Sequence, residues 1–363
     1  MLSRKLNIIP VWLFRSEAGE LLDPTLFRLL AHLRESGKLT RAAQAAGVSY
    51  RHAWNLLDRG ERFFEQPLVE MRRGHGTRLS ALGETLLWSE QRMKARLGPQ
   101  IDSMASELNH QLQQLLDGEH RVLRLHASHG YAVALLPDFA GELDLRYCHP
   151  GEALDALERG ECDLASFHVP TCPQLAERVM QRYRRQLAYR DLAVIRFVTR
   201  RQGLMVRAGE GERISGLDAL TRAGIRFINR DAHSGTRVLF NLLLARQGID
   251  EAQIQGARQE EFTHTAVAAY VAAGMADVGF GLEGAAAQFG LDFIDLCGEH
   301  YLLLCREEQL SQERVQALLA YMTSKQLAAG IDALDGYAAD RCGEVTTFEA
   351  LLAEDRERAA GTL

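Results

Sequence analysis

The chain has 363 residues, of which 47% are apolar and 25% charged, with a mean hydropathy of -0.17. At about 100 to 200 residues per domain this predicts two or three folded domains, and it excludes disordered and fibrous proteins. No run of about 18 apolar residues occurs and the N-terminus lacks a signal-peptide pattern, so we expect a cytoplasmic protein without a membrane span. Six cysteines without a C-x-x-C pair predict reduced thiols rather than a disulfide scaffold or a metal site.

The net charge of -6 is distributed unevenly along the chain. Residues 1–98 hold 16 Lys and Arg against 10 Asp and Glu, whereas residues 99–363 hold 26 against 38. A basic module joined to a larger acidic one is typical of a nucleic-acid binder with a separate regulatory or catalytic body. On charge alone, an ordinary solvated surface is an equal alternative.

Residues 40–64 have the spacing of two short helices joined by a tight turn. Thr40 is expected to cap the first helix, Gly47 to allow the turn and Ser49 to cap the second helix, which is anchored by Ala53 and Leu56. The polar residues near the start of the second helix would face base edges and phosphates, although an alanine-rich helix pair is also common as plain core. The predicted DNA contacts of this segment are Thr40, Arg41, Ser49, Tyr50, Arg51, Trp54 and Asn55.

A basic hairpin is expected next, over residues 68–79. A short apolar strand enters a tip with two glycines and several basic side chains, which suits a wing that lies against a phosphate backbone. Its predicted DNA contacts are Arg72, Arg73 and Arg78. Ser80 is expected to cap a long helix that starts at Ala81.

The long helix has an apolar stripe between Ile101 and Leu116 that includes Met104, Leu108 and Leu112, and an interruption is expected near Gly98–Pro99. Such a stripe must be buried, either on the chain's own body or against a second chain. Because the helix lies between two domains, we favour dimerisation through a linker helix at residues 91–118.

The N-terminal motifs also resemble those of a known family. LTRAAQAAGVSYRHAWNLLDR followed by PLVEMRRGHGTRLSALGETLL is similar to the winged helix-turn-helix of the LysR family, and more closely to that of the molybdate-responsive ModE regulators. The likeness covers about residues 8–90. It implies a DNA-binding domain at residues 1–90, with double-stranded DNA as the partner.

From Arg121 onwards, short strands alternate with helical stretches, which predicts an α/β body with mostly parallel sheets. Residues 160–165 and 274–279 share a G-x-x-D-apolar-small pattern, and each follows an amphipathic helix and enters an apolar strand. This repeat predicts two similar lobes.

The body is similar to bilobal type II periplasmic-binding-protein-like effector domains of the type found next to molybdenum-cofactor biosynthesis and tungstate-binding proteins. FINRDAHSGTRVLFNLLLARQGI, GMADVGFGLEGAAAQFGLDFIDL and GYAADRCGEV carry this resemblance. It implies an effector domain at residues 119–363, with lobe I at about 119–197 and 301–350 and lobe II at about 198–300. The effector would lie in the cleft between the lobes.

The segment from Asp231 to Arg237 is the strongest candidate for holding a ligand. Ser234 and Thr236 offer hydroxyls, Gly235 lets backbone N–H groups approach, and the helix start contributes partial positive charge, which together favour an oxyanion or phosphate. An ordinary helix cap is the alternative, and the sequence leaves open which of Arg230 and Arg237 faces the cleft. Lone histidines such as His129 and His168 are more often satisfied polar residues than metal ligands. The candidate effector residues are Ser128, His129, Ser166, Arg230, Ser234, Gly235, Thr236, Arg237 and Thr263.

The leading hypothesis is a transcription regulator in which a dimeric winged helix-turn-helix binds DNA and the bilobal domain senses a small anion. Molybdate or tungstate is favoured because both halves resemble families tied to those anions, and a molybdopterin-type cofactor or other phosphate-bearing metabolite is the alternative. A homodimer is expected, with a tetramer on DNA and RNA polymerase as further candidate partners, and with no metal, catalytic cofactor or membrane. An enzyme using Ser128 or Ser166 is disfavoured because no catalytic motif accompanies these serines.

Overall fold

The computed structural model of the chain describes residues 13–72, 76–117, 122–139, 143–188 and 191–361. Two compact units make up the chain, with the boundary between Gly98 and Pro99 inside a long helix. Among the described residues, no helix is both long enough and apolar enough to cross a membrane.

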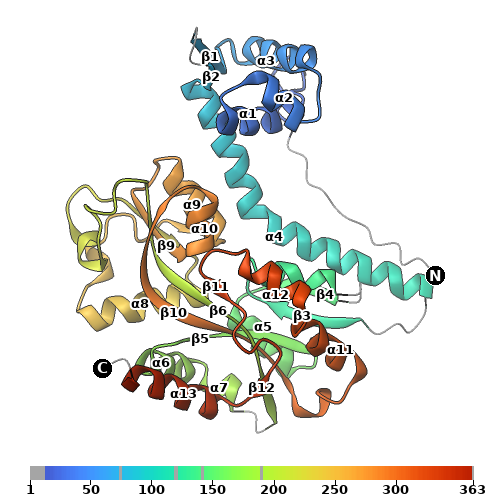
Figure 1. The fold of residues 1–363 in the computed structure, drawn as a ribbon, viewed down its shortest axis with the longest axis vertical. Coiled ribbons are helices and arrows are strands. Elements are labelled where there is room, and N and C mark those ends of the chain that lie inside the picture. Colours follow the sequence, from blue (N-terminus) through green and yellow to red (C-terminus); the bar gives the residue numbers. More distant parts are fainter. Residues whose placement is uncertain (1–12, 73–75, 118–121, 140–142, 189–190, 362–363) are drawn as a thin grey trace. The chain divides into compact units, whose positions relative to one another are not determined.

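The N-terminal unit consists of three helices, a hairpin and the start of the long helix (Figure 1). Its helices and strands are α1 (Thr25–Ser36), α2 (Leu39–Ala45), α3 (Tyr50–Phe64), β1 (Val69–Arg72), β2 (Gly76–Leu79) and α4 (Ala81–Asp117). Leucines of α1 and α3 and alanines of α2 form one buried core. The small alanine side chains let α2 approach α1 and α3 closely, which is the packing that the sequence predicts.

The two predicted helix caps have different outcomes. The Ser49 side chain accepts a hydrogen bond from the His52 N–H at 3.1 Å and caps α3, as predicted, and Gly47 makes the turn before it with φ of 72°. The prediction for Thr40 is wrong, because α2 begins at Leu39 and its N-cap is Lys38, which makes no side-chain cap bond. The buried side chain of Leu39 draws the helix start forward into the core, so Thr40 lies inside the helix.

Strands β1 and β2 form the predicted antiparallel hairpin, and the segment 73–75 between them lies outside the described residues. Ser80 caps α4 as predicted. Its hydroxyl donates to the Pro67 carbonyl at 2.6 Å and accepts from the Gly83 N–H at 3.1 Å, which ties the hairpin to the helix start.

Helix α4 runs without a break through Pro99, so the predicted interruption is wrong. Proline removes one backbone hydrogen bond from a helix, a cost of about 3 kcal/mol. Beyond Pro99 the helix docks on the edge strand β4 (Leu143–Tyr147), where Ser103 Oγ accepts from the Tyr147 N–H at 2.9 Å and Ser106 Oγ accepts from the Leu145 N–H at 3.1 Å. These tertiary contacts oppose a break at the proline.

The second unit is built on one mixed sheet. The strands, besides β4, are β3 (Leu123–Ala127), β5 (Leu164–Pro170), β6 (Leu192–Val206), β7 (Phe227–Arg230), β8 (Glu260–Glu261), β9 (Val278–Leu282), β10 (Asp292–Arg306), β11 (Tyr337–Ala338) and β12 (Val345–Thr346). The order is β4-β3-β5-β10-β6-β9-β7-β8, with β11 and β12 paired to β6. Neighbours are parallel within β4-β3-β5 and within β9-β7-β8, and antiparallel between these groups. The mostly parallel sheet that the sequence predicts is therefore found only at the two ends.

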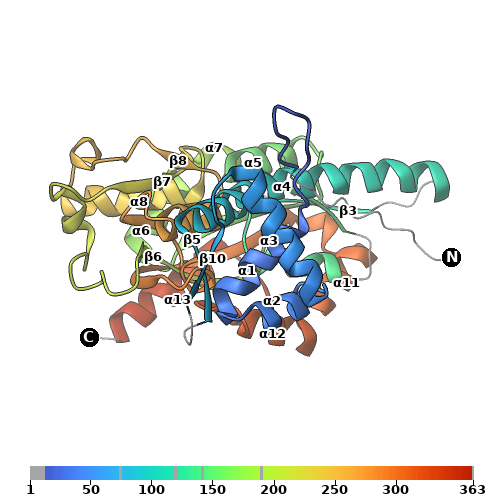
Figure 2. The same cartoon turned by 90° about the horizontal axis from the view of Figure 1, so that it is seen from above.

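The two parallel ends are the two lobes: lobe I contains β3, β4 and β5, and lobe II contains β7, β8 and β9. The helices of this unit are α5 (Pro150–Glu158), α6 (Pro173–Arg182), α7 (Arg184–Leu187), α8 (Gly235–Gln247), α9 (His264–Ala272), α10 (Glu283–Gln288), α11 (Glu313–Met322), α12 (Lys325–Asp332) and α13 (Phe348–Gly361). Figure 2 shows β7, β8 and α8 at one end of the unit and β3 and α11 at the other.

The antiparallel strands β6 and β10 join the lobes. Each strand has 15 residues, and their pairing extends from Leu192 opposite Arg306 to Val206 opposite Asp292. The apolar runs LDFIDL and YLLLCR, which read as two short strands, are joined in the single strand β10. One end of β6 lies in the core of lobe I and the other end lies in the core of lobe II, so the chain crosses between the lobes along these strands.

The repeated G-x-x-D segments make the same contacts in both lobes. Asp163 on lobe I accepts from the Arg124 N–H at 2.8 Å and from the Arg124 guanidinium, which also donates to the Gly160 carbonyl at 3.1 Å. Asp277 on lobe II accepts from the Arg226 N–H at 2.9 Å, and the Arg226 guanidinium donates to the Gly274 carbonyl at 2.8 Å. The structure thus confirms the predicted duplication.

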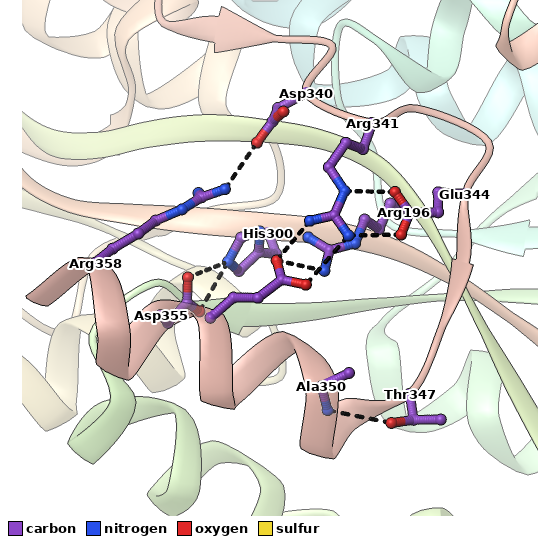
Figure 3. Close-up of polar contacts among 10 residues, drawn as sticks. Arg196, His300, Asp340, Arg341, Glu344, Thr347, Ala350, Asp355 and Arg358 are labelled. Carbon is purple, nitrogen blue, oxygen red and sulfur yellow. Dashed lines mark hydrogen bonds and ion pairs between the residues drawn. The ribbon is translucent and has the colours of Figure 1, made fainter.

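The C-terminal helix α13 lies beside α6 and buries Leu351 and Leu352 (Figure 1). Figure 3 shows the polar contacts that hold it: His300 Nε2 is 2.9 Å from Asp355 Oδ2, and Arg196 on β6 donates to Glu354 at 2.8 Å. Arg341 also donates to Glu354, at 2.8 Å. Because His300 and Asp355 are both buried, removal of either partner would leave a polar group without compensation.

Candidate functional site

The predicted nucleic-acid contacts of the N-terminal unit whose side chains the structure describes are exposed. Tyr50, Arg51, Trp54 and Asn55 are exposed on α3, on the side opposite the buried core residues. Thr40, Arg41 and Ser49 are also exposed, as is Arg78 on β2. Arg73 lies outside the described residues, and only the backbone of Arg72 is described. The arrangement suits a recognition helix, and the individual DNA contacts stay predictions.

The second unit contains a small pocket between its lobes. The cavity has a volume of about 20 Å³, enough for the centre of one small ion or water molecule. Its lining comes from lobe I (Ser128, His129, Tyr147, Cys148, His149 and His168), from β6 (Arg200) and from lobe II (Arg230, Ser234, Gly235, Thr236, Phe262 and His264). The lining includes no carboxylate.

The lobe I wall is formed by the loop after β3. The Ser128 N–H donates to Ser166 Oγ at 2.8 Å, and the Tyr301 hydroxyl donates to the Ser128 carbonyl at 2.8 Å. Both bonds use the Ser128 backbone, while Ser128 Oγ is buried and has no hydrogen-bond partner among the described residues. Ser166 is not part of the lining and instead supports Ser128 through this bond, and its predicted effector contact stays a prediction.

The lobe II wall is formed by the start of α8. Ser234 Oγ accepts from the Arg237 N–H at 3.2 Å and donates to the Asp231 carbonyl at 2.7 Å. The Ser234 hydroxyl is therefore committed to the helix cap, contrary to its predicted role as a donor to the effector. A Cβ on Gly235 would lie 3.5 Å from both His168 and Pro150, so the backbone of α8 closely approaches lobe I. Thr236 Oγ1 lies 3.4 Å from His264 Nε2.

Thr263 does not line the pocket, and its predicted effector contact stays a prediction. Its side chain accepts from the Ala266 N–H at 2.9 Å and caps α9. The flanking Phe262 and His264 line the cavity instead.

Two candidate arginines are distinguished by their partners. Arg237 pairs with Glu251 and Glu260, and donates to the Arg230 carbonyl at 3.1 Å, so it is not the arginine of the pocket. Arg230 lines the pocket and donates through Nη1 to the Phe262 carbonyl, while its buried Nε has no partner within the described ranges. Burial lowers the pKa of Arg230 to about 9, an effect opposed by Asp231 and reinforced by Arg200.

Arg200 is the main residue that sequence reasoning missed. It is only 4% exposed, donates to Glu299 through Nε at 2.8 Å and lies with Nη2 2.9 Å from His168 Nδ1. Its Nη1 is buried and without a partner in the part of the chain that the structure describes. The available signal was a charged pair, Arg200–Arg201, in the middle of an apolar strand where the chain crosses between lobes.

Three histidines of the pocket, buried His168 and His264 and half-buried His129, are neutral. Burial, together with Arg230 and Arg200, lowers the pKa of His129 to about 4, and the pKa values of His168 and His264 also lie well below the usual range because of burial and the two arginines. One ring nitrogen of each lacks a partner in the described chain: His129 Nδ1, His168 Nε2 and His264 Nδ1. They are not the satisfied polar residues that the sequence favours. No group of three or more potential metal ligands is arranged around an ion site in the described residues.

The chemistry of the pocket is therefore that of a hydrogen-bond donor site. Buried polar groups are nearly always paired, and an unpaired donor costs about 1–3 kcal/mol. Two guanidinium groups and neutral imidazoles that surround a small cavity without a carboxylate would be satisfied by an anion that accepts hydrogen bonds.

Comparisons with known proteins concern both units. Residues 24–84 match the family of bacterial regulatory helix-turn-helix proteins, lysR family, and residues 139–323 match the PBP superfamily domain. The chain is 33% identical to the uncharacterized protein YvgK of Bacillus subtilis over 189 residues, which are 52% of this chain and 60% of that protein. It is 28% identical to the molybdenum transport protein ModE of Azotobacter vinelandii over 98 residues, which are 26% of this chain and 36% of that protein. The chain thus spans less than two thirds of the length of each of these relatives.

Among solved structures, the chain is similar to OxyR of Corynebacterium glutamicum, with a TM-score of 0.42 and 14% identity. The match covers 92% of this chain and 95% of that one.

Proposed function

We propose that the chain, whose C-terminal unit belongs to the PBP superfamily, is a LysR-type DNA-binding transcription regulator in which this unit senses a small oxyanion, molybdate or tungstate in the first place. Such regulators are not enzymes, and the proposal concerns only what the pocket binds and how binding acts on DNA recognition.

The observation that carries the proposal is the set of buried donors without acceptors around the pocket. Arg200 Nη1, Arg230 Nε and His168 Nε2 all belong to lining residues, and none has a partner among the described residues. An oxyanion offers an acceptor to each donor and opposes the positive charge of Arg230, while the charge of Arg200 is paired with Glu299. The N–H groups in the first turn of α8 add to the same effect.

Size and likeness favour a small tetrahedral anion over a larger phosphate-bearing molecule. The cavity of about 20 Å³ has room for about one water-sized group, so the lobes would move apart slightly for a tetrahedral oxyanion and much further for a molybdopterin-type cofactor. The likeness of 98 residues of the chain to ModE, named as a molybdenum transport protein, supports molybdate or tungstate over sulfate and phosphate.

Binding would act by shifting the equilibrium between lobe arrangements. The two lobes contact each other directly: the Tyr131 hydroxyl lies 2.9 Å from Thr265 Oγ1 and donates to Gln288 at 2.8 Å, and His149 Nε2 lies 3.3 Å from Asp231 Oδ1. An anion held by both walls adds contacts that exist only when the lobes are together, so it favours that arrangement. Helix α4, which docks on lobe I and continues into the DNA-binding unit, is the connection through which operator affinity would change.

Isothermal titration of the full-length protein with sodium molybdate, tungstate, sulfate and phosphate tests the proposal. Gly235→Asp should abolish binding, because it places a carboxylate where the α8 backbone meets lobe I. Gly235→Ala is the matched control, since its Cβ would make only ordinary contacts at 3.5 Å. Absence of heat with all four anions, or wild-type affinity in Gly235→Asp, would contradict the proposal.

A further inference from the structure

His168 is held in one orientation by a chain of buried contacts that begins at Glu299. Resting on the oxyanion-sensing function proposed above, we infer that Glu299, acting through Arg200, fixes the ring proton of His168 on Nε2 and so makes His168 an anion-binding donor. His168 binds the effector in this account, and Glu299 is a positioning residue behind it.

The outer end of this series of contacts is the buried carboxylate of Glu299, which has three donor contacts. Arg200 Nε and Nη2 lie 2.8 and 2.7 Å from Glu299 Oε2, and Gln202 Nε2 lies 2.6 Å from the same oxygen. Glu299 is 1% exposed and Arg200 is 4% exposed. The carboxylate therefore determines where the guanidinium lies, with Nη2 toward His168 and Nη1 beside Gly130, whose added Cβ would lie 3.1 Å from it.

The chemistry of arginine decides which ring nitrogen of His168 carries the proton. A guanidinium has donors and no acceptor, so the 2.9 Å contact between Arg200 Nη2 and His168 Nδ1 requires that Nδ1 accepts. A neutral imidazole has one N–H, which must then be on Nε2. Burial and the two nearby arginines keep the ring neutral by lowering its pKa.

Packing keeps the ring in this orientation. Tyr301 meets the His168 ring edge to face with a centroid separation of 4.4 Å, and the Arg200 guanidinium carbon lies 4.9 Å from the centre of the Tyr301 ring. The Tyr301 hydroxyl is itself fixed by the Ser128 carbonyl at 2.8 Å. A flip of the imidazole would give up its hydrogen bond with Arg200.

The consequence is a third obligate donor beside Arg200 Nη1 and Arg230 Nε. His168 adds direction without adding charge, because the ring is neutral. The pocket thereby presents three N–H groups that only an acceptor can satisfy, and the effector class is an oxyanion with at least three acceptor oxygens.

Nitrogen-15 NMR of the full-length protein, labelled at histidine and assigned with His168→Asn, measures the tautomer directly. The expected His168 signals at neutral pH are a protonated Nε2 and an unprotonated Nδ1. Glu299→Gln, which keeps the shape but removes the charge, should produce signals from both tautomers. A proton on Nδ1 in the wild type would overturn the inference.

Titration with sodium molybdate gives the second readout. His168→Asn keeps an acceptor near Nδ1 but loses the Nε2 donor, and it should bind about 5- to 150-fold more weakly. His168→Gln keeps a donor near Nε2 and should bind more tightly than the Asn variant. His300→Asn is the control for loss of a buried histidine, because His300 pairs with Asp355 outside the pocket, and it should retain wild-type affinity.

The outcomes separate the two proposals. Wild-type binding of molybdate together with equal binding by His168→Asn overturns the inference and leaves the proposed function standing. Failure of the wild type to bind any of molybdate, tungstate, sulfate and phosphate overturns the proposed function and, with it, the role of His168 in binding.

Discussion

Replacement of Arg230 by Gln should weaken anion binding without weakening the fold. Arg230 is 6% exposed, lines the pocket and has a buried Nε without a partner among the described residues. The Arg230 side chain should therefore strengthen anion binding and destabilise the folded protein.

The size of each effect follows from the burial of the guanidinium. A hydrogen bond to a charged group contributes about 1.5–3 kcal/mol, so loss of the Arg230 donor should weaken binding about 10- to 150-fold. Burial lowers the pKa of Arg230 to about 9, below the value in the unfolded chain, so the cation destabilises the folded state at pH 7. Gln removes this destabilisation, and the Tm of the anion-free protein should stay the same or rise.

Titration calorimetry and thermal unfolding of Arg230→Gln measure the two effects. Arg237→Gln is the matched control, because Arg237 pairs with Glu251 and Glu260 and should leave anion affinity unchanged. Equal loss of affinity in both variants, or a Tm drop in Arg230→Gln that accounts for its weak binding, would refute the reasoning.

Three further outcomes are expected. The pKa of His129 is about 4 in the folded protein and about 6.5 in the unfolded chain, so the unfolded chain takes up a proton first as the pH falls. The free energy of unfolding should therefore fall by up to about 3 kcal/mol from this residue alone between about pH 6.5 and about pH 4. Urea unfolding with no change over this range would contradict this prediction. Asn55→Ala on the exposed side of α3 should reduce discrimination between DNA sequences by about 1–3 kcal/mol, whereas Arg62→Ala, which breaks only the Asp58 pair, should not, as measured by competition binding. Met104, 66% exposed, and Leu108, 39% exposed, lie on α4, and Glu at both positions should produce monomers in sedimentation if this helix forms the dimer; an unchanged dimer would assign the contact to another surface.

Local patterns in the sequence predicted most of the fold. The Ser49 and Ser80 caps and the duplicated G-x-x-D contacts depend on residues close in sequence or on a repeated motif, and all three were confirmed. The failures concern places where tertiary contacts decide. Buried Leu39 moved the start of α2 ahead of Thr40, and docking of Ser103 on β4 accompanies an unbroken helix through Pro99.

The pocket was predicted only in part, for a related reason. The start of α8 is a local signal, and its residues line one wall of the pocket. Arg200 and His168 come from strands far apart in the sequence, and they meet only because β5 and β6 both pair with β10. Which of Arg230 and Arg237 faces the cavity depends on Glu251 and Glu260, whose positions no local pattern reveals.

The most direct test of an oxyanion between the lobes is a crystal of the full-length protein soaked or grown with tungstate and measured at the tungsten absorption edge. The account predicts one strong anomalous peak in the pocket, from the tungsten of an anion whose oxygens accept hydrogen bonds from lining donors such as Arg230 Nε and His168 Nε2. A pocket without a peak, in a crystal whose tungstate is bound at another place on the chain, would contradict it.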